Sequence, residues 1–524
     1  MRLTSLLLLG LTAQLVTLTA QTNVLTYHND VQRTGHNLTE TTLTPSNVNS
    51  TTFGKLFLVT LDGVVDAQPL YVAAQAIPNQ GTHNVLIIAT ENDSMYALDA
   101  DTGAQLWKAS LLAGGETPSD TRNCGQVSPQ IGVTSTPVIQ LKSGASGGAI
   151  FAVAMSKDPS GNYHQRLYKL NLLTGKPLVA ALEITATYPG TGDNSTNGSV
   201  VFDPSQYKER SGLLILNGVV YLAWASHCDI RPYTGWIMGY NAGTLARVSL
   251  LNVTPNGSEG AIWGAGGGLA ADANGSIYFL DANGTFDSTL NAQGFPTNGD
   301  FGNAFIKLST SGGKLTVADY FTMDNTLKES SGDVDLGSGG ALVVPSNANG
   351  PHLAVGAGKD GNIYLVNRDN MGKFNSANDS SIYQEIDGAL PGGIWSMPAV
   401  FGSRIYFGAV GGPIRAFQFN SSWKLVATPV SVTSASFPYP GATPSISANG
   451  STNAILWAVE NGSTAVLHAY PAGNLAKELY NSSQAAGGRD DFGAGNKFMV
   501  PTIANGKVYV GTPTGVAAFG LLGH

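Results

Sequence analysis

Short apolar segments, each bounded by turn residues, recur along the whole chain. Three of them follow one another at Asn84–Ala89, Ser94–Asp99 and Gln105–Ala109, with Thr102 and Gly103 between the last two. Runs of this length, rich in Val, Ile, Leu and aromatic residues and flanked by Gly, Asn or Asp, are typical of buried β-strands joined by tight turns. The pattern therefore predicts a small antiparallel sheet in this region.

The same pattern of apolar segments and turns recurs at intervals of roughly 40–60 residues, which is typical of β-propellers. The repeats predict an all-β fold: a single β-propeller of about eight four-stranded blades. Two stacked β-sandwiches would not explain a motif that returns in every unit. The later copies lie at Arg166–Asn171, Trp236–Asn241, Phe305–Leu308, Ile363–Arg368, Ile414–Phe417, Val466–Tyr470 and Val516–Phe519.

The two ends of the repeat region are complementary. The last copy stops at Gly520–Leu522, before any outer strand, whereas Phe53–Leu61 resembles an outer strand with no blade before it. We expect these two ends to pair and close the ring, because closure removes the free sheet edges that invite aggregation. This interpretation divides the chain into residues 1–20, a lead-in segment at 21–52 and a propeller at 53–524.

Composition narrows the possible partners. Charged residues make up only 12% of the chain, the net charge is -8 and the pI is near 5.5. A polyanion-binding protein needs an extended basic surface, so a nucleic-acid partner is not expected. The hydrophobic fraction of 43% is large enough for a sizeable core.

Residues 1–20 have the pattern of a secretory signal peptide. Arg2 precedes an apolar stretch from Leu6 to Leu18, and a small residue, Ala20, marks the expected cleavage point. The stretch is too short for a membrane anchor and is interrupted by polar residues, and no later segment could span a bilayer. The sequence therefore predicts a secreted or periplasmic protein.

The chain contains two cysteines, Cys124 and Cys228. An exported protein meets an oxidising compartment, so we expect a disulfide between them. His227 and Asp229 flank Cys228, but one Cys and one His without a second ligand pair are a weak indication of a metal site.

The repeat resembles that of pyrroloquinoline-quinone (PQQ) dehydrogenases. The residues that carry the resemblance are Asp99, Thr102, Gly103 and Trp107, and the segment Tyr27–Val48 is similar to the lead-in that precedes the first blade of quinoprotein alcohol dehydrogenases. The resemblance covers nearly the whole mature chain. It implies the fold but leaves the chemistry open, because the same propeller also occurs in non-enzymatic proteins.

In that family, a quinone lies flat on a Trp at the channel mouth, is bound to a divalent cation and faces an Asp base. By resemblance, Trp263 is the stacking residue, Asn283 and Asp335 are ligands of a Ca²⁺ ion, and Asp333 is the catalytic base. Two carboxylates at i and i+2 of an extended segment point the same way and could share a cation.

Two further positions resemble cofactor-binding residues of the family. Lys359 stands where a basic residue contacts the quinone oxygens, and Trp395 where a second aromatic lines the pocket. In a four-stranded blade, the interblade link and the turn between the second and third strands emerge on the same face of the disc. We therefore expect all six residues to surround one channel mouth.

Two departures from the family pattern leave the function open. The family's metal-ligand Glu falls near Ser160, with Asp158 as the nearest carboxylate, and the adjacent Cys-Cys pair of many quinoprotein alcohol dehydrogenases is missing, with Cys124 alone in that region. One hypothesis is a PQQ- and Ca²⁺-dependent dehydrogenase of alcohol or sugar hydroxyls. The other is a non-catalytic propeller that has lost the cofactor and binds a ligand or a protein partner.

Each candidate also has a structural interpretation. Trp263 and Trp395 could pack between blades, and the two Asp residues could form Asx turns. Asn283 begins an Asn-Gly pair that by itself indicates a hairpin. Lys359 could form an exposed ion pair with its neighbour Asp360.

Overall fold

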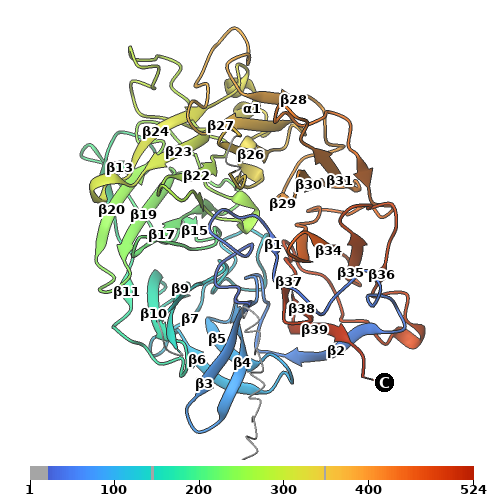
Figure 1. The fold of residues 1–524 in the computed structure, drawn as a ribbon. Helices are drawn as coiled ribbons and strands as arrows, with labels where there is room; N and C mark the ends of the chain where they lie inside the picture. The colour runs from blue at the N-terminus through green and yellow to red at the C-terminus, as the bar shows by residue number, and fades with distance from the viewer. Residues whose placement is uncertain (1–21, 143–146, 347–349, 524) are drawn as a thin grey trace, which may run out of the picture.

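The computed structural model describes residues 22–142, 147–346 and 350–523. The predicted signal peptide, residues 1–20, lies outside this range. Eight sheets, each with four strands in the blade pattern, surround a central axis (Figure 1). The prediction of an all-β propeller with about eight blades is confirmed.

Successive strands of a blade pair antiparallel, from the channel outward. Blade 1 contains β3 (Leu70–Ile77), β4 (Gly81–Thr90), β5 (Ser94–Asp99) and β6 (Gln105–Ser110); blade 2 contains β8 (Val138–Leu141), β9 (Gly148–Lys157), β10 (Tyr163–Asn171) and β11 (Leu182–Glu183). Blade 3 contains β16 (Leu214–Leu216), β17 (Val219–Ala223), β19 (Trp236–Asn241) and β20 (Arg247–Asn252); blade 4 contains β21 (Ala270–Ala271), β22 (Ile277–Leu280), β23 (Phe305–Ser309) and β24 (Thr316–Phe321).

The second half of the ring repeats this order. Blade 5 contains β25 (Leu342–Val343), β26 (Leu353–Ala357), β27 (Ile363–Asn367) and β28 (Gln384–Ile386); blade 6 contains β29 (Ala399–Phe401), β30 (Arg404–Gly408), β31 (Ile414–Gln418) and β32 (Ser431–Val432). Blade 7 contains β33 (Ser445–Asn449), β34 (Thr452–Glu460), β35 (Val466–Pro471) and β36 (Tyr480–Asn481); blade 8 contains β37 (Thr502–Ala504), β38 (Lys507–Thr512), β39 (Gly515–Leu521) and β2 (Phe53–Thr60).

The remaining strands are short additions: β1 (His36–Asn37), β7 (Thr117–Pro118), β12 (Thr187–Pro189), β13 (Ser195–Thr196), β14 (Ser199–Val201), β15 (Tyr207–Lys208) and β18 (Ala225–Ser226). Among the residues that the structure describes, helical structure is limited to α1 (Thr326–Ser331) and the 3-10 turns η1 (Gly264–Gly266), η2 (Ser311–Gly313), η3 (Leu336–Ser338) and η4 (Ala486–Gly488). Within the described ranges, no helix has the length and apolar character needed to cross a bilayer.

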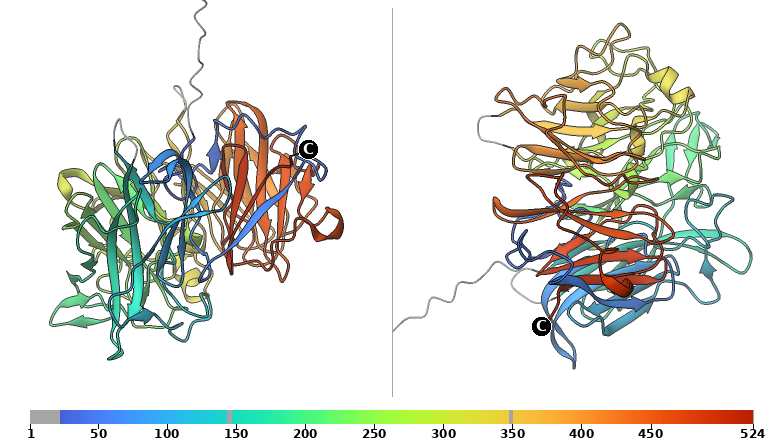
Figure 2. Two further views of the ribbon diagram at one scale, coloured as in Figure 1. Left: turned by 90° about the horizontal axis from the view of Figure 1, so that it is seen from below. Right: turned by 90° about the vertical axis from the view of Figure 1, so that its right-hand side faces the viewer.

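The ring closes through its termini. The N-terminal strand β2 pairs antiparallel with the C-terminal strand β39, from Phe53 opposite Leu521 to Thr60 opposite Gly515. In Figure 1 and Figure 2 the blue β2 accordingly runs beside the red last blade. The predicted pairing of the two ends is confirmed, and blade 8 gains its outer strand in this way.

The recurring Asp, Thr, Gly and Trp positions explain how a blade folds and packs. The Asp99 carboxylate accepts hydrogen bonds from the backbone N–H groups of Asp101 and Thr102, and Gly103 has a left-handed φ of 77° that favours glycine. Trp107 then packs on the Gly175 backbone of blade 2 and donates its indole N–H to Leu172 O over 3.1 Å. The motif therefore forms the turn within one blade and the contact with the next.

The N-terminal lead-in segment runs through the centre of the ring. Backbone oxygens of residues 24–35 accept hydrogen bonds from the inner strands of blades 1, 2, 4, 5, 6 and 7. Arg33 is fully buried there, and its guanidinium donates to Leu269 O and Tyr27 O. Tyr27 in turn lines a small void that shares Arg210 and Phe498 with the larger cavity of the functional site. The segment thus forms the floor beneath that cavity.

Candidate functional site

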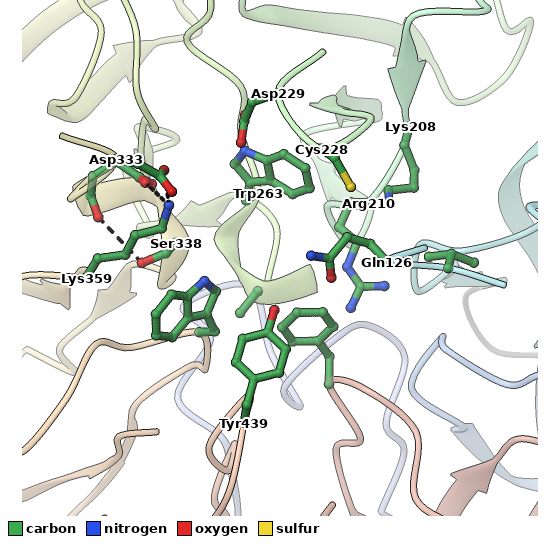
Figure 3. A pocket seen from close by; sticks show the side chains of 15 residues that line it. Gln126, Lys208, Arg210, Cys228, Asp229, Trp263, Asp333, Ser338, Lys359 and Tyr439 are labelled. Atoms are coloured by element: carbon green, nitrogen blue, oxygen red, sulfur yellow. Dashed lines mark hydrogen bonds and ion pairs between the residues drawn. The ribbon is translucent and has the colours of Figure 1, made fainter. Parts of the chain in front are cut away.

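A cavity of about 290 Å³ opens at the centre of the ring, and side chains from seven blade junctions converge on it (Figure 3). Five of the six residues predicted for the cofactor site line it, so the predicted convergence is confirmed for those five. The lining residues are Gln126, Val127, Lys208, Arg210, Cys228, Asp229, Trp263, Ala265, Asp333, Asp335, Ser338, Lys359, Trp395, Tyr439 and Phe498.

The lining residues come from equivalent places in successive blades. Seven of the eight interblade links contribute at least one residue each, from Gln126 between blades 1 and 2 to Phe498 between blades 7 and 8. The others follow a second strand: Cys228 and Asp229 in blade 3, and Lys359 in blade 5. This origin explains why positions far apart in the sequence meet at one end of the channel.

One ammonium group joins the two candidate carboxylates. Lys359 Nζ lies 2.6 Å from Asp335 Oδ1 and also forms an ion pair with Asp333. Its partner is not Asp360, as the structural interpretation of the sequence suggested; the Asp360 carboxylate instead accepts the Tyr364 hydroxyl. Burial alone would lower the pKa of Lys359, but the carboxylate of Asp335 and the contact with Asp333 raise it overall, so the group is an ammonium at neutral pH.

The two carboxylates have different environments. The Asp335 side chain is 2% exposed and that of Asp333 is 68% exposed. Burial raises the pKa of Asp335, against the lowering effect of Lys359. The sequence analysis assumed an extended segment at Asp333–Asp335, but Asp333 has a left-handed φ of 55°. Both carboxylates nevertheless contact Lys359. Of these two acids, Asp333 is therefore the one more accessible to a molecule entering the cavity.

Asn283, the sixth predicted residue, lies one contact behind the cavity wall. Its side-chain amide donates to Asp333 Oδ1 over 2.7 Å, and Asn283 is 7% exposed. Its own Oδ1 is buried and has no hydrogen-bond partner among the described residues. Asn283 thus orients Asp333 and keeps one acceptor free.

Aromatic rings form much of the remaining wall. Trp263 is partly exposed at the cavity, and Trp395 meets Tyr439 edge to face at 5.6 Å between ring centroids. Apolar walls with a few convergent polar groups are typical of small-molecule sites.

The predicted disulfide is present and forms part of the cavity wall. Cys124, in the link between blades 1 and 2, bonds to Cys228, after the second strand of blade 3, with 5.5 Å between their Cα atoms. The bond therefore ties the link between blades 1 and 2 to a turn within blade 3.

Unfavourable backbone conformations cluster around the cavity. Five non-glycine lining residues have a left-handed φ, which side chains with a Cβ rarely adopt: Cys228, Asp229, Ala265, Asp333 and Phe498, with φ between 51° and 65°. Such conformations persist only where the surrounding structure enforces them, and they concentrate at functional sites. Their presence favours a binding or catalytic role for the cavity.

Asp229 is a site residue for which the sequence analysis predicted no role in the cavity. Its carboxylate accepts a hydrogen bond from the Tyr233 hydroxyl over 2.7 Å, and the residue lines the cavity after the second strand of blade 3. Blade topology could have indicated Asp229, because it follows the second strand of blade 3 as Lys359 follows the second strand of blade 5.

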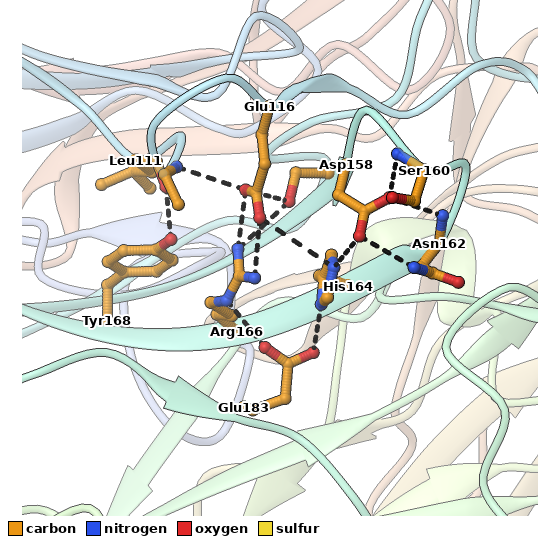
Figure 4. A network of polar contacts seen from close by, with 11 residues as sticks. Leu111, Glu116, Asp158, Ser160, Asn162, His164, Arg166, Tyr168 and Glu183 are labelled. Carbon is orange, nitrogen blue, oxygen red and sulfur yellow. Dashed lines mark hydrogen bonds and ion pairs between the residues drawn. The ribbon is translucent and has the colours of Figure 1, made fainter.

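Ser160 and Asp158 lie elsewhere, which corrects the position inferred for a family metal ligand. Asp158 accepts hydrogen bonds from the backbone of Ser160 and from Asn162, and belongs to a polar network around His164 on the second blade (Figure 4). That network supports the β9–β10 turn and includes no cavity-lining residue. The acid that the third blade places in the wall is Asp229.

Two buried cations, Lys208 and Arg210, were also missed. They lie in the link between blades 2 and 3, are 1% and 4% exposed, and line the cavity. Lys208 ends the short strand β15, which pairs with β18 next to Cys228. No recognisable motif marks this link, so the sequence alone gave no signal for them.

The residues present suit a planar, negatively charged organic group better than a metal ion. Trp and Phe rings, a disulfide and buried cations surround the space. A Ca²⁺ ion requires six to eight oxygen ligands. Among the described residues no three His, Cys, Asp or Glu side chains form a metal-binding group, and the Lys359 ammonium already contacts both Asp333 and Asp335.

Comparison with solved structures identifies the architecture. No protein-family model matches the sequence, and a search of curated proteins gives no match. The quinohemoprotein alcohol dehydrogenase from Comamonas testosteroni superposes with a TM-score of 0.61 at 12% identity, covering 96% of this chain and 81% of that chain. The chain has the PQQ-type propeller fold.

Two other structures agree. The quinohemoprotein alcohol dehydrogenase ADHIIG from Pseudomonas putida HK5 gives a TM-score of 0.59 at 13% identity, covering 95% of this PQQ-type propeller and 80% of that chain. A europium-containing methanol dehydrogenase gives a TM-score of 0.58 at 12% identity, and the match covers 95% of this chain and 98% of that chain. At such identity the similarity concerns the fold, so the function of this PQQ-type propeller must be argued from its cavity.

Proposed function

We propose that this protein is an exported oxidoreductase that binds a quinone of the PQQ type in the central cavity and oxidises an alcohol or sugar hydroxyl. One observation carries the proposal: Trp263, Asp333, Asp335, Lys359 and Trp395, selected by resemblance over more than a hundred positions, line the same cavity. The disulfide supports export, because such bonds persist in oxidising compartments.

The proposal gives each wall a role. Trp263, the Cys228 end of the disulfide and Trp395 line the cavity and would hold the planar group, with the Trp rings available for stacking. When bound, such a quinone would supply the two-electron oxidant that takes up a hydride equivalent from the hydroxyl-bearing carbon. Asp333 accepts the hydroxyl proton on its carboxylate, which the 68% exposure of its side chain makes accessible.

Lys359 and Asn283 position the base. The Lys359 ammonium and the Asn283 amide both contact Asp333, which fixes the orientation of its carboxylate. Ca²⁺ ligation by Asn283 and Asp335 stays a prediction, and no step of the proposed chemistry depends on it, because Lys359 already supplies positive charge at Asp333 and Asp335.

The alternative is a non-catalytic propeller that binds a ligand or a protein partner. It is favoured by the lack, among the described residues, of a three-residue group of metal-binding acids, Cys or His. The two functions differ in one measurable property, since both allow ligand binding but only the oxidoreductase shows turnover.

The test uses purified mature protein mixed with PQQ, with and without Ca²⁺. Retention of the quinone after gel filtration is followed by its absorbance, and turnover by dye-linked oxidation of a panel of alcohols and sugars. We expect retention and turnover of at least one substrate. Asp333→Asn should keep the quinone but lose at least about 100-fold in rate, as expected for loss of a general base.

Three outcomes would contradict the proposal or one of its parts. Quinone that is not retained by the wild-type protein in either condition would exclude the cofactor. Retained quinone without turnover of any substrate would favour the non-catalytic alternative. Unchanged turnover in Asp333→Asn would remove Asp333 from the mechanism.

A further inference from the structure

The cavity wall between blades 2 and 3 carries two positive charges that the protein itself does not neutralise. Lys208 is 1% exposed and Arg210 is 4% exposed. Within the described part of the chain, neither side chain forms an ion pair or a hydrogen bond through its charged group. Both line the cavity.

Buried charges of this kind normally have a partner. Removing an ammonium or guanidinium group from water costs several kcal/mol unless an opposite charge or several hydrogen bonds compensate it. A protein that keeps two such groups facing one cavity pays that cost in the empty state. The arrangement is explained if a ligand supplies the missing anion.

The nearest acids do not supply it. Asp66 and Glu91 act on Lys208 only through space. Asp66 Oδ1 accepts the Asn496 amide over 2.8 Å, and burial raises the pKa of Glu91 well above its usual range, which disfavours the anionic form of that side chain. Burial likewise raises the pKa of Glu209, which lies between the two cations in the sequence.

A third cation strengthens the positive potential. Lys497 lowers the pKa of Lys208 through its charge, and its Nζ donates to Gln126 Oε1, a cavity-lining residue, over 3.1 Å. The wall around Lys208, Arg210 and Lys497 is therefore cationic, whereas Asp333 and Asp335 lie on the side of blades 4 and 5.

Aromatic rings hold the two cations in place. Lys208 Nζ lies 5.7 Å from the Trp263 ring centroid, and the Arg210 guanidinium lies 4.1 Å from that of Phe498. Such contacts stabilise a cation modestly but do not neutralise it. They also place positive charge beside rings on which a planar molecule can stack.

We infer that this wall is a receptor for a carboxylate carried by a planar aromatic ligand, with Lys208 and Arg210 donating to the carboxylate while the ring lies among Trp263 and Phe498. The inference deepens the proposed function by assigning a ligand class to the same cavity. It does not require the ligand to be redox-active, and so it can be tested separately.

The test compares 2-naphthoate with its neutral isostere 2-naphthamide by isothermal titration calorimetry on the mature protein. We expect the acid to bind at least tenfold more tightly than the amide. Lys208→Met and Arg210→Met should each weaken 2-naphthoate binding at least tenfold and leave that of 2-naphthamide unchanged. Lys176→Met is the control, because Lys176 is exposed in a blade 2 turn and is not a cavity-lining residue.

Equal affinity of acid and amide for the wild-type protein would overturn the inference, and this comparison needs no variant to fold. Unchanged 2-naphthoate affinity in both folded variants would also overturn it. If 2-naphthoate binds as expected but quinone and substrates give no turnover, the receptor stands and the proposed oxidoreductase function fails. If turnover is found but 2-naphthoate and 2-naphthamide bind with equal affinity, the oxidoreductase function stands and the carboxylate receptor fails.

Discussion

Lys359 Nζ lies 2.6 Å from the buried carboxylate of Asp335 and contacts the exposed carboxylate of Asp333 at the same time. The sequence reading placed a divalent cation near these carboxylates. A lysine ammonium is a compact point charge that can satisfy two carboxylates, although with fewer contacts than a metal ion makes. The two candidate occupants therefore compete for the same acids.

Removing the ammonium should create cation affinity. In Lys359→Met, Asp333 and Asp335 lose their counter-charge, and we expect Tb³⁺, a luminescent Ca²⁺ analogue, to bind at least tenfold more tightly than in the wild-type protein. Energy transfer from the tryptophans at the cavity reports the binding. Lys359→Arg keeps the charge and serves as the matched control. Equal Tb³⁺ affinity in all three proteins would show that Lys359 does not compete with a cation.

Ring closure depends on a close backbone contact at the start of β39. A Cβ added to Gly515 would lie 1.9 Å from Val59 O in the paired strand β2. We therefore expect Gly515→Ala to lower the free energy of unfolding by about 3 kcal/mol or more, as for other severe steric conflicts. Chemical denaturation measures the change.

Gly473→Ala is the control for that experiment, because a Cβ at Gly473 meets no atom within 4 Å. Its effect should stay within about 0.5 kcal/mol, as for most surface substitutions. Equal stability of the two variants would mean that β2 does not close the ring. Deleting residues 21–61 should destabilise the protein further, since it also removes Arg33 and the segment that fills the channel.

The fold could be predicted because its signal is repeated. A misread strand in one blade is corrected by the same motif in the next, and the Asp99 turn with its Trp107 contact shows the physical basis of that motif. Once the blade register was right, Trp263, Asp333 and Trp395 had to emerge on one face. Their meeting at one cavity follows from topology more than from any local chemistry.

The cationic wall could not be predicted in this way. Lys208 and Arg210 look like two ordinary surface charges in the sequence, and only the packed structure shows that both are buried. Asp229 was read as a neighbour of Cys228 and not as a wall residue of blade 3. The suggested ion pair between Lys359 and its sequence neighbour Asp360 was also wrong, because the fold brings Lys359 to Asp333 and Asp335 instead.

The disulfide should stabilise the fold and the cavity together. Cys124 and Cys228 are 104 residues apart, so their bond restricts a long loop in the unfolded chain. Replacing both with Ser should lower the free energy of unfolding by about 2–4 kcal/mol. Denaturation measures the change, with wild-type protein under reducing conditions as the comparison. Free thiols at both positions in non-reducing peptide mapping of the mature protein would contradict the assignment.

Lys208 should make the stability of the empty protein depend on pH. Burial lowers the pKa of Lys208 from 10.5 to about 7. Between these values the unfolded chain holds a proton that the folded protein lacks, so stability rises with pH across this window, and below about pH 7 the full cost of the buried ammonium remains. Each unit of pKa shift corresponds to about 1.4 kcal/mol.

Lys208→Met removes that cost. Without ligand, we expect the variant to have a higher melting temperature than the wild-type protein at pH 6, and the difference to shrink as the pH approaches 10. Lys176→Met should follow the wild-type curve. With 2-naphthoate present the order should reverse at pH 6, because the carboxylate stabilises only the protein that keeps the ammonium. A Lys208→Met protein that is less stable than wild type at pH 6 without ligand would show that Lys208 already has a partner within the chain, and the anion receptor would lose its physical basis.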